Sequence, residues 1–493
     1  MPVGKATHRR KHWSTNQVPC IVASAMFRSL SVSGLLVLSL ATLTHAQNQG
    51  GQQQNATVVQ LPSQGVAINA RGVLSLISVA DPGGRLRAAR TRAARQALPM
   101  SVVKPSKLRK ISLVRLENEI RKRLDAGLPL TDEILNLAGL HRLQYVFFYP
   151  QENDIVIAGP AEGWVQDPAG RTVGMTTFRP IVKLEDLLVA LRAYGPGRRS
   201  PKLVGCSIDA TGEGLQRLRK FQQTIPRTIP DRLRGQVARR IATGTQRALG
   251  MARIRVFGIS PRSRAAQVLI EADYRMKLMA IGLERPPLKM ATYIGKLRRA
   301  PKNMLQRWWF TPQYDAVKVS PSRLAMELVG QGVQLNTEDI DIGNKGGLGK
   351  ARKPSAASAA FSKSFTRLYP NIAALRPVYA QMRNIVDLLV AAAFIQQQRW
   401  YSKAGWSMPL LSDERRLLTE RFPVPKEAPC VSNAVWKGSR FFAPAGGGVA
   451  IQPGRAISAK QLAVGEDRNQ RVIASHQRAR LYQPKDSKRW WWD

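Results

Sequence analysis

The chain has 493 residues, and its 76 lysines and arginines against 32 aspartates and glutamates give a formal net charge of +44 at pH 7. A positive charge of this size favours a polyanionic partner or a surface adapted to an acidic matrix, and both interpretations stay open. Only two of the histidines, His141 and His476, lie beyond residue 46, which excludes a zinc site of the HExxH type in that part of the chain.

Residues 1–46 have the three parts of a secretory signal peptide. Basic residues precede an apolar run from Leu30 to Leu43, and the sequence THA that ends at Ala46 supplies a cleavage site. The apolar run is short for a transmembrane helix, so we expect export to the periplasm, envelope or exterior after cleavage at Ala46. Two alternatives stay open: an N-terminal anchor that is not cleaved, and a true start at Met26.

Residues 47–106 are expected to form a flexible and partly basic leader. Gln, Asn and Gly dominate its first part, which is typical of a disordered segment. Arginines then recur in the sequence RLRAARTRAARQAL, which is either a solvated linker or a basic helix that contacts an anionic polymer. The candidate contacts on such a helix are Arg90, Arg92 and Arg95.

Residues 107–200 are predicted to form helices and two β-hairpins. The apolar spacing between Leu113 and Leu124 indicates an amphipathic helix. The strands of the first hairpin are QYVFFYP and NDIVIAGP, and those of the second are GWVQ and RTVGMTT. A further helix is expected from Leu184 to Tyr194, because Gly and Pro follow it directly.

Residues 201–340 form the predicted central unit. The strand KLVGCSID, two helices, the strand ARIRVFGIS and a helix from Ala265 to Leu283 alternate as they do in an α/β layer. The short runs RWWF, DAVKVS, RLAMELVG and VQLNTE then predict an antiparallel meander. The predicted fold class is therefore α+β, with a small mixed α/β layer, antiparallel hairpins or a meander, and a C-terminal helical segment.

Three segments complete the chain. Residues 341–357 are rich in Gly and Lys and are expected to form a loop, and residues 358–455 are expected to form a helical segment and a hairpin around GGG. The apolar centre IVDLLVAAAFI contains Asp387 and is too short to span a bilayer, which predicts a buried core helix and no transmembrane span in the mature chain. Residues 456–493 form a basic tail.

Four stretches of the sequence occur together, and in the same order, in a known family. They are LAGLHRLQYVFFYPQENDIVIAGPAEGW, VGCSIDATGEGLQRL, EADYRMKLMAIGLERPP with MLQRWWFTPQYDAV, and PVYAQMRNIVDLLVAAAFIQ. Over roughly Lys110 to Pro453 the chain resembles the bacterial domain-of-unknown-function 1598 family of secreted proteins. The resemblance implies export and assigns no catalytic residue and no cofactor.

Two acid–base pairs stand out in the helix from Ala265 to Leu283. Glu271 precedes Arg275 by four residues and Asp273 precedes Lys277 by four, the favourable order for surface ion pairs worth roughly 0.2 to 0.5 kcal/mol each. The alternative is a hydrolase of extracellular polymer, which would use two carboxylates about 5 to 9 Å apart across a cleft. The candidate carboxylates are Glu271, Asp273 and Glu327.

Tryptophans are the candidate ligand contacts. Trp308 and Trp309 are neighbours in a predicted strand, so one is expected to enter the core and the other to face outward. An outward indole beside Arg307 could stack on a sugar or another flat ligand, although packing in the core or at an interface is the alternative. Trp490 to Trp492 could insert at a membrane interface, dock on a partner, or belong to a disordered end.

Cys206 and Cys430 are the only cysteines beyond residue 46. In an oxidising compartment they could form one disulfide between the central strand and the C-terminal part, and two buried free thiols are the alternative. The sequence contains no motif that predicts a metal ion or a cofactor.

The leading hypothesis is an exported, non-catalytic protein that binds an anionic envelope or extracellular polymer, or a partner protein, through basic and aromatic surface. Nucleic acid is not excluded as the polyanion. The first alternative is the hydrolase with carboxylate chemistry. The second is a scaffold for other exported proteins, which an exposed apolar patch would favour.

Overall fold

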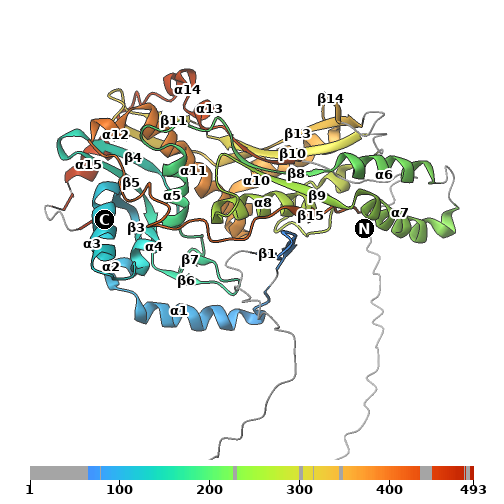
Figure 1. The fold of residues 1–493 in the computed structure, drawn as a ribbon, viewed down its shortest axis with the longest axis horizontal. Coiled ribbons are helices and arrows are strands. Elements are labelled where there is room, and N and C mark those ends of the chain that lie inside the picture. The colour runs from blue at the N-terminus through green and yellow to red at the C-terminus, as the bar shows by residue number, and fades with distance from the viewer. Residues whose placement is uncertain are drawn as a thin grey trace, which may run out of the picture. The chain divides into compact units, whose positions relative to one another are not determined.

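The computed structural model describes residues 65–77, 79–225, 230–298, 304–314, 316–342, 348–433, 447–481, 483–484 and 489–493. All of them belong to one compact unit, in which helices pack on two large β-sheets (Figure 1). The predicted α+β class is confirmed. The expected signal peptide, residues 1–46, lies outside the described residues.

The larger sheet has seven strands in the order β14-β13-β10-β16-β8-β9-β15. In that order the strands are Leu348–Arg352, Gly332–Ile342, Met304–Gln313, Gly447–Ile451, Val204–Ala210, Met251–Phe257 and Glu427–Pro429. β10 and β16 run parallel, and the other neighbouring strands run antiparallel. Helices α8 (Arg264–Ala280) and α10 (Ala356–Leu375) pack against one face of this sheet.

The smaller sheet has six antiparallel strands in the order β11-β12-β4-β5-β3-β17. They are Ala316–Val319, Ala325–Val329, Tyr145–Tyr149, Asp154–Ala161, Ser106–Ser112 and Trp491–Trp492. β4 and β5 form the first predicted hairpin. The second predicted hairpin is the separate ribbon of β6 (Trp164–Gln166) and β7 (Thr172–Gly174). A third ribbon pairs β1 (Val66–Ile68) with β2 (Leu74–Leu76).

The meander predicted in the central unit is wrong in its strand pairing. β10 pairs with β13 in the larger sheet, whereas β11 and β12 pair with each other at the edge of the smaller sheet. The four runs are strands, but apolar alternation does not say which strand pairs with which, and here the chain leaves one sheet, adds two strands to the other, and returns.

Two stretches near the C-terminus also differ from the expectation. The stretch 341–357, expected to be a loop, includes strand β14, which pairs with β13. Strand β16 begins at Gly447, inside the expected hairpin turn, and it lies between β8 and β10 instead of pairing with a neighbour in sequence. The proposed partner strand FFAP, in residues 441–444, lies outside the described residues.

Helix α11 (Pro377–Gln397) is the buried core helix that the sequence predicts. Of the described helices it is the one long and apolar enough to cross a membrane, and the whole apolar window is buried inside the protein. It follows α10 directly, because Pro377 begins a new helix after Arg376 takes an extended conformation.

The remaining helices vary from one turn to four turns. They are α1 Arg85–Ala97, α2 Met100–Val103, α3 Leu113–Asp125, α4 Asp132–Leu135, α5 Leu184–Ala193, α6 Gly212–Gln223, α7 Arg234–Leu249, α9 Tyr293–Lys296, α12 Trp400–Lys403, α13 Pro453–Ala456, α14 Ala459–Val464 and α15 Arg471–Leu481. Thus part of the expected flexible leader is structured, since it includes α1 and α2.

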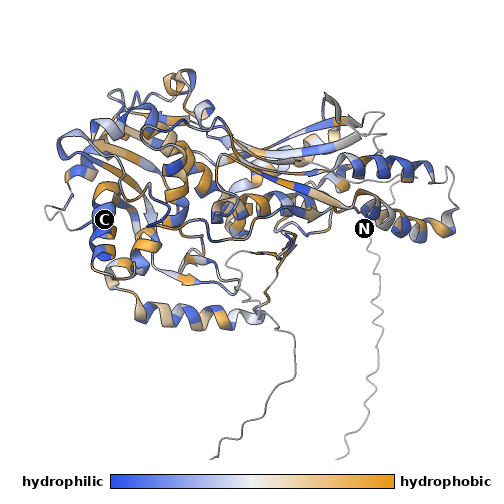
Figure 2. Ribbon diagram, viewed as in Figure 1, coloured by the Kyte–Doolittle hydropathy of each residue, from blue (hydrophilic) through white to orange (hydrophobic). Residues whose placement is uncertain are grey.

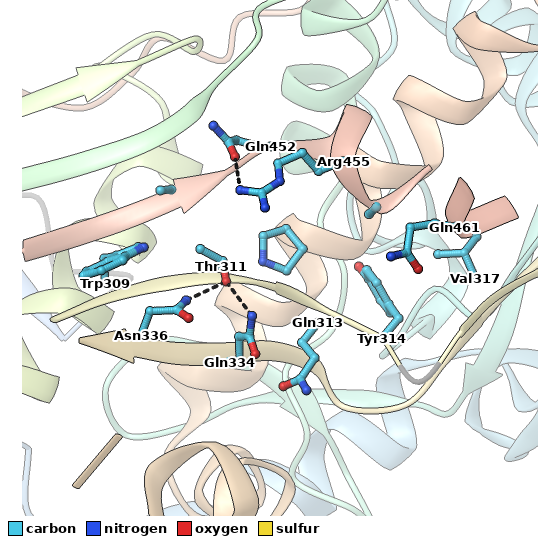
Figure 3. Close-up of a pocket in the computed structure, with 13 residues that line it drawn as sticks. Trp309, Thr311, Gln313, Tyr314, Val317, Gln334, Asn336, Gln452, Arg455 and Gln461 are labelled. Atoms are coloured by element: carbon cyan, nitrogen blue, oxygen red, sulfur yellow. Dashed lines mark hydrogen bonds between the residues drawn. The ribbon is translucent and has the colours of Figure 1, made fainter. Parts of the chain in front are cut away.

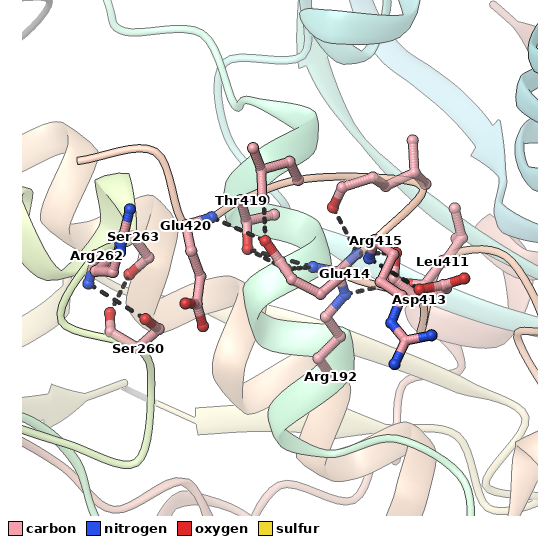
Figure 4. A network of polar contacts seen from close by, with 12 residues as sticks. Arg192, Ser260, Arg262, Ser263, Leu411, Asp413, Glu414, Arg415, Thr419 and Glu420 are labelled. Carbon is pink, nitrogen blue, oxygen red and sulfur yellow. Dashed lines mark hydrogen bonds and ion pairs between the residues drawn. The ribbon is translucent and has the colours of Figure 1, made fainter.

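The irregular segment after α12 is fixed by two charged side chains. Arg192 on α5 donates to the carbonyl oxygens of Leu411 at 2.8 Å and Leu417 at 2.9 Å, and it pairs with Glu414 (Figure 4). Glu117 on α3 is buried and accepts from the backbone N–H of Leu411 at 2.9 Å. Backbone groups that would be paired within a helix or a sheet are here paired with these two side chains. A segment without helices or strands can therefore be part of the core.

The C-terminal tryptophans pack inside the protein, so neither membrane insertion nor a disordered end describes them. β17 pairs with β3, and Trp490 to Trp492 are all buried. Beside them, the fully buried guanidinium of Arg109 lies 4.6 Å from the Trp491 ring and donates to Asp493 at 2.8 Å. A buried cation requires such a counter-charge, which ties these last residues to β3.

Cys206 and Cys430 are separate, buried thiols, so the disulfide considered above is not formed. Cys206 lies in the middle of the larger sheet, where burial, with the Asp273 carboxylate, raises the pKa of its thiol well above the usual value. Burial also raises the pKa of Cys430, to about 11. Both side chains act as small core residues.

His141 is buried in the core. Burial lowers the pKa of its imidazole from 6.5 to about 4, with Arg179 and Arg383 acting in the same direction and Glu162 opposing them. Between these two pH values the unfolded chain binds a proton that the folded chain does not, so this histidine makes stability rise with pH. Its contribution is complete above pH 6.5 and is lost as the pH falls toward 4.

We expect His141→Gln to remove this pH dependence. A pKa difference of this size corresponds to roughly 3 kcal/mol. The free energy of unfolding of the native protein should therefore fall, relative to that of the variant, by up to this amount between pH 7 and pH 4. Urea unfolding of both proteins at several pH values measures the difference between their free energies of unfolding. Other groups with shifted pKa values, such as Asp154, are present in both proteins, so their contributions cancel in this difference. A difference that does not change with pH would contradict the assignment.

Candidate functional site

The larger sheet has one face covered by helices and an outer face that carries Trp309. Trp308 is fully buried and packs edge-on against Phe361 of α10, whereas Trp309, the next residue of β10, is partly exposed on the opposite side. The predicted opposite orientation of these two indoles is confirmed. The alternation follows from the period-two geometry of a strand.

The register places small residues beside Trp309 on the outer face. Trp309 pairs with Asn336 of β13 on one side and with Gly448 of β16 on the other. Gly448 pairs with Ser207 of β8, and Ser207 pairs with Arg255 of β9. These five residues form one row across five strands, in the order Asn336, Trp309, Gly448, Ser207 and Arg255.

A cavity of about 390 Å³ lies at the Trp309 end of the outer face (Figure 3). We call it the Trp309 groove. Its lining residues come from β10, β13 and β16 of the larger sheet, from β11 of the smaller sheet, and from α13, α14 and adjacent turns. They are Trp309, Thr311, Pro312, Gln313, Tyr314, Val317, Gln334, Asn336, Ala450, Gln452, Arg455, Ala456 and Gln461. Amides dominate the polar part of this set, Arg455 is its one cation, and no carboxylate belongs to it.

The polar side chains of the Trp309 groove are held in place by one another. The hydroxyl of Thr311 accepts from the amide nitrogen of Asn336 at 2.7 Å and from that of Gln334 at 3.2 Å. Arg455 donates to the amide oxygen of Gln452 at 3.1 Å (Figure 3). The groove therefore presents pre-positioned amides, which offer donors and acceptors together.

Tyr314 fixes one end of the groove. Burial, and the neighbouring Asp387 carboxylate, raise the pKa of Tyr314 well above its usual value, so its hydroxyl stays protonated. The hydroxyl donates to Asp387 of α11 at 3.0 Å, and Arg142 pairs with the same carboxylate at 3.2 Å. This buried network holds the Tyr314 ring in the wall of the groove.

Arg307 supports the indole of Trp309. Its guanidinium lies 5.9 Å from the Trp309 ring and pairs with Glu338 of β13 at 3.1 Å. The pair is partly exposed, so its stabilisation is small, but the cation next to the ring limits the orientations of the indole. Whether Arg307, Trp308 and Trp309 bind a ligand stays a prediction.

The three candidate carboxylates are not brought together in this structure. Glu271 and Asp273 are fully buried on α8, so the prediction of two surface ion pairs is wrong in its location, although both pairs form, at 2.8 Å and 2.7 Å. Glu327 lies on β12 of the smaller sheet and accepts from Tyr145 at 2.7 Å. None of the three lines the Trp309 groove.

The two buried acids of α8 differ in their surroundings. Burial raises the pKa of Asp273 to about 6, and Lys277 opposes this shift. Lys277 also donates to the carbonyl oxygen of Ile208 at 2.9 Å, so it links α8 to β8. Glu271 instead receives bonds from two arginines and a backbone N–H. These contacts indicate a structural role, because each acid pairs with a cation inside the core, although the Oδ1 atom of Asp273 has no hydrogen-bond partner among the described residues.

The candidate arginines of the leader lie on helix α1, so that segment is a basic helix and not a linker. Arg90 is half-buried and donates to the carbonyl oxygen of Asp167 at 2.6 Å, next to β6. Arg92 and Arg95 are exposed. Hydrophilic and hydrophobic residues alternate along α1 (Figure 2), but no residue of the helix is buried.

Sequence reasoning found Trp309 and missed the other residues of the groove. Thr311, Gln334 and Asn336 lie on the outer face, at every second position of their strands. The alternation of polar and apolar residues within the runs RWWFTPQ and VQLNTE could have predicted this orientation. No local sequence pattern predicts that Gln452, Arg455 and Gln461 line the groove. Among the described residues, no group of three or more His, Cys, Asp or Glu side chains could hold a metal ion.

Comparisons with known proteins agree with part of the resemblance. No curated protein and no solved structure matches the chain. The model of a family described as a protein of unknown function (DUF1598) matches residues 206–293, which include most of β8, all of α6, α7, β9 and α8, and the first residue of α9. The resemblance to the DUF1598 family is therefore confirmed over residues 206–293.

Proposed function

We propose that this protein is an exported, non-catalytic binding protein that holds a saccharide chain of an envelope or extracellular polymer in the Trp309 groove. The observation that carries the proposal is the partly exposed indole of Trp309 at an amide-lined cavity of about 390 Å³ without a carboxylate in its lining. Export rests on the signal-peptide pattern and on the resemblance to a family of secreted proteins.

The chemistry of the groove suits a sugar. The face of a pyranose ring carries C–H groups that pack on an indole, and its hydroxyl groups need donors and acceptors placed side by side. The amides of Gln334 and Asn336 and the guanidinium of Arg455 meet that need. The volume also lies at the lower end of the range of about 300 to 1,000 Å³ that is common for ligand sites.

The hydrolase alternative receives no support from the geometry. Hydrolysis of a glycosidic bond needs two carboxylates on either side of the bond, and the candidate acids are buried in α8 or lie in the other sheet. The net charge of +44 instead favours retention of the protein on an acidic material.

Trp309→Ala tests the proposal. We expect the variant to bind an immobilised polysaccharide at least about 10-fold more weakly than the native protein, a loss of about 1.4 kcal/mol, because the stacking surface is removed. Affinity electrophoresis against a panel of neutral and acidic polysaccharides measures the change, and thermal unfolding shows whether the fold is kept.

Phe178→Ala is the matched control. Phe178 is also a partly exposed aromatic residue under an arginine, since the Arg87 guanidinium lies 4.6 Å from its ring, but it does not line the groove. This variant should bind as the native protein does. Equal losses in the two variants, or no loss in Trp309→Ala, would overturn the proposed site.

A further inference from the structure

Helix α11 carries two charged residues one turn apart, Asp387 and Arg383, and they differ in their partners. Asp387 is fully buried, accepts from the Tyr314 hydroxyl and pairs with Arg142. Arg383 is 8% exposed, and its guanidinium has no hydrogen bond and no ion pair within the described part of the chain. Its Nε atom is buried without a partner. The positive charge of Arg383 is therefore not neutralised by a direct contact.

The other arginines that are buried to a similar extent each have a carboxylate partner. In the described ranges these pairs are Arg109 with Asp493, Arg171 with Glu271, and Arg264 with Asp186. Moving a charge from water into a protein core is unfavourable unless a counter-charge or hydrogen bonds replace the water. For Arg383 we therefore expect a partner from outside the chain.

The side chains around Arg383 add positive charge to its own. Burial lowers the pKa of its guanidinium, Arg142 and Arg179 lower it further by repulsion, and Asp387 opposes them. Burial also lowers the pKa of His141, and Arg179 and Arg383 act in the same direction. The Nδ1 atom of His141 is a second buried polar atom without a hydrogen-bond partner among the described residues. Three arginines thus surround one fully buried carboxylate.

Glu162 is the other acid near this position, and its oxygens are already bonded. It raises the pKa of His141 and so opposes the arginines there. Its carboxylate accepts from the backbone N–H of Thr176 at 2.8 Å, from that of Thr177 at 3.1 Å, and from the Thr177 hydroxyl. Glu162 therefore does not supply the counter-charge that Arg383 lacks.

Arg383 lies where α11 meets the segment 175–183, between β7 and α5, and the start of β13. The next residue, Asn384, donates to the carbonyl oxygen of Pro180 at 3.5 Å. On the other side, a Cβ atom at Gly332 of β13 would lie 3.1 Å from Cγ of Arg383. Arg179 is exposed and the side chain of Arg142 is 23% exposed, so these neighbours reach solvent. An arginine buried this deeply leaves room for a small ligand only.

We propose that Arg383 binds a small monovalent anion of the size of chloride, and that Arg142 and Arg179 add attraction for it. The N–H groups of a guanidinium donate to such an anion and supply the opposite charge. The bound anion links α11 to the segment 175–183. The inference does not depend on the proposed function, because none of these three arginines lines the Trp309 groove.

A water molecule is the alternative partner for Arg383. Water would accept from the N–H groups of the guanidinium, but it would not offset the positive charge. The two partners differ in one measurable respect. Only a bound anion makes the stability of the folded protein rise with the logarithm of the anion concentration.

Thermal unfolding of the native full chain in two salts tests the proposal. Sodium chloride replaces sodium gluconate, a much larger anion, at fixed ionic strength, so that general screening stays constant. We expect the Tm to rise by at least about 2 °C between 1 and 100 mM chloride. Crystals grown in bromide should show the anomalous signal of a bound ion at the guanidinium of Arg383.

Arg383→Met should remove the dependence on chloride. In gluconate this variant should be at least as stable as the native protein, because it lacks a buried charge without a partner. Arg383→Lys keeps a charge without the fork of the guanidinium, so its dependence on chloride should be intermediate.

Arg264→Met is the matched control. Arg264 is 7% exposed, close to the value for Arg383, but it pairs with Asp186. The variant should be less stable than the native protein in both salts and should keep the native dependence on chloride. If this variant does not fold, Arg307→Met provides the same comparison at a partly exposed ion pair.

Three results would overturn the assignment. The first is a native Tm that does not change with chloride at fixed ionic strength, which would leave water as the partner. The second is an equal dependence on chloride in the native protein and Arg383→Met. The third is a loss of stability for Arg383→Met in gluconate as large as that for Arg264→Met, which would show that Arg383 has a partner within the chain.

Discussion

Replacing Glu271 by glutamine is expected to lower the free energy of unfolding by about 3 to 5 kcal/mol, because it leaves the buried Arg171 without its counter-charge. The carboxylate accepts from Arg171 at 2.6 Å and from Arg275 at 2.8 Å, and its second oxygen accepts from the backbone N–H of Gly65 at 3.2 Å. Glu271 is fully buried and Arg171 is 6% exposed, so water cannot replace the lost bonds. Urea unfolding at neutral pH measures the loss.

Glu338→Gln is the control for this experiment. It breaks an ion pair with Arg307 of ordinary length, 3.1 Å, but the arginine side chain is 40% exposed. Water and salt screen such a pair, so the loss should stay below about 1 kcal/mol. A loss for Glu271→Gln as small as that of the control would show that Arg171 finds another partner.

A single methyl group at Gly447 is expected to cost roughly 2 to 6 kcal/mol. Gly447 has a backbone φ of +134°, which alanine adopts only with strain, and a Cβ atom there would lie 1.9 Å from the carbonyl oxygen of Trp308. The strain and the clash act at the parallel pairing of β16 with β10. We therefore expect Gly447→Ala to unfold at a markedly lower urea concentration.

Gly235→Ala is the matched control, because it adds the same atom where space is open. Gly235 lies in α7 at a negative φ, and nothing lies within 4 Å of the added Cβ atom. In a helix this change should be neutral or should stabilise the protein by up to about 1 kcal/mol. If the two variants have the same free energy of unfolding, the close packing of β16 against β10 does not determine the stability of the protein.

Local patterns were sufficient for elements whose partners are close in sequence. The β4–β5 and β6–β7 hairpins were predicted, since each pairs strands on either side of one turn. The buried α11 was predicted from its apolar centre. The position of β16 could not be predicted, because its neighbours β8 and β10 lie far away in the sequence, and no local pattern identifies a distant partner.

The charged residues of α8 show a second limit. An acid and a base four residues apart form an ion pair on an exposed or a buried helix face alike, so the spacing predicted both pairs and not their burial. What distinguishes Glu271 is Arg171, a partner 100 residues away on the loop between β6 and β7. A sequence without its tertiary partners does not reveal this third member.

The candidate site shows the same division. The alternation of Trp308 and Trp309 predicted one outward indole, and the structure places it on the groove. Gln452 and Arg455 could not be assigned to the site from sequence, because they come to Trp309 only through the pairing of β16 with β10. Such a site is a property of strand order and register.

The position of β16 has a consequence for the synthesis of the chain. Without this strand the larger sheet consists of two separate halves, β14-β13-β10 and β8-β9-β15, and residues 447–451 join them. The two strands that flank it, β8 and β10, end at residues 210 and 313, so in a chain that emerges from its N-terminus each of them has an unpaired edge until β16 is made. The continuous larger sheet therefore forms only in a chain that includes residues 447–451.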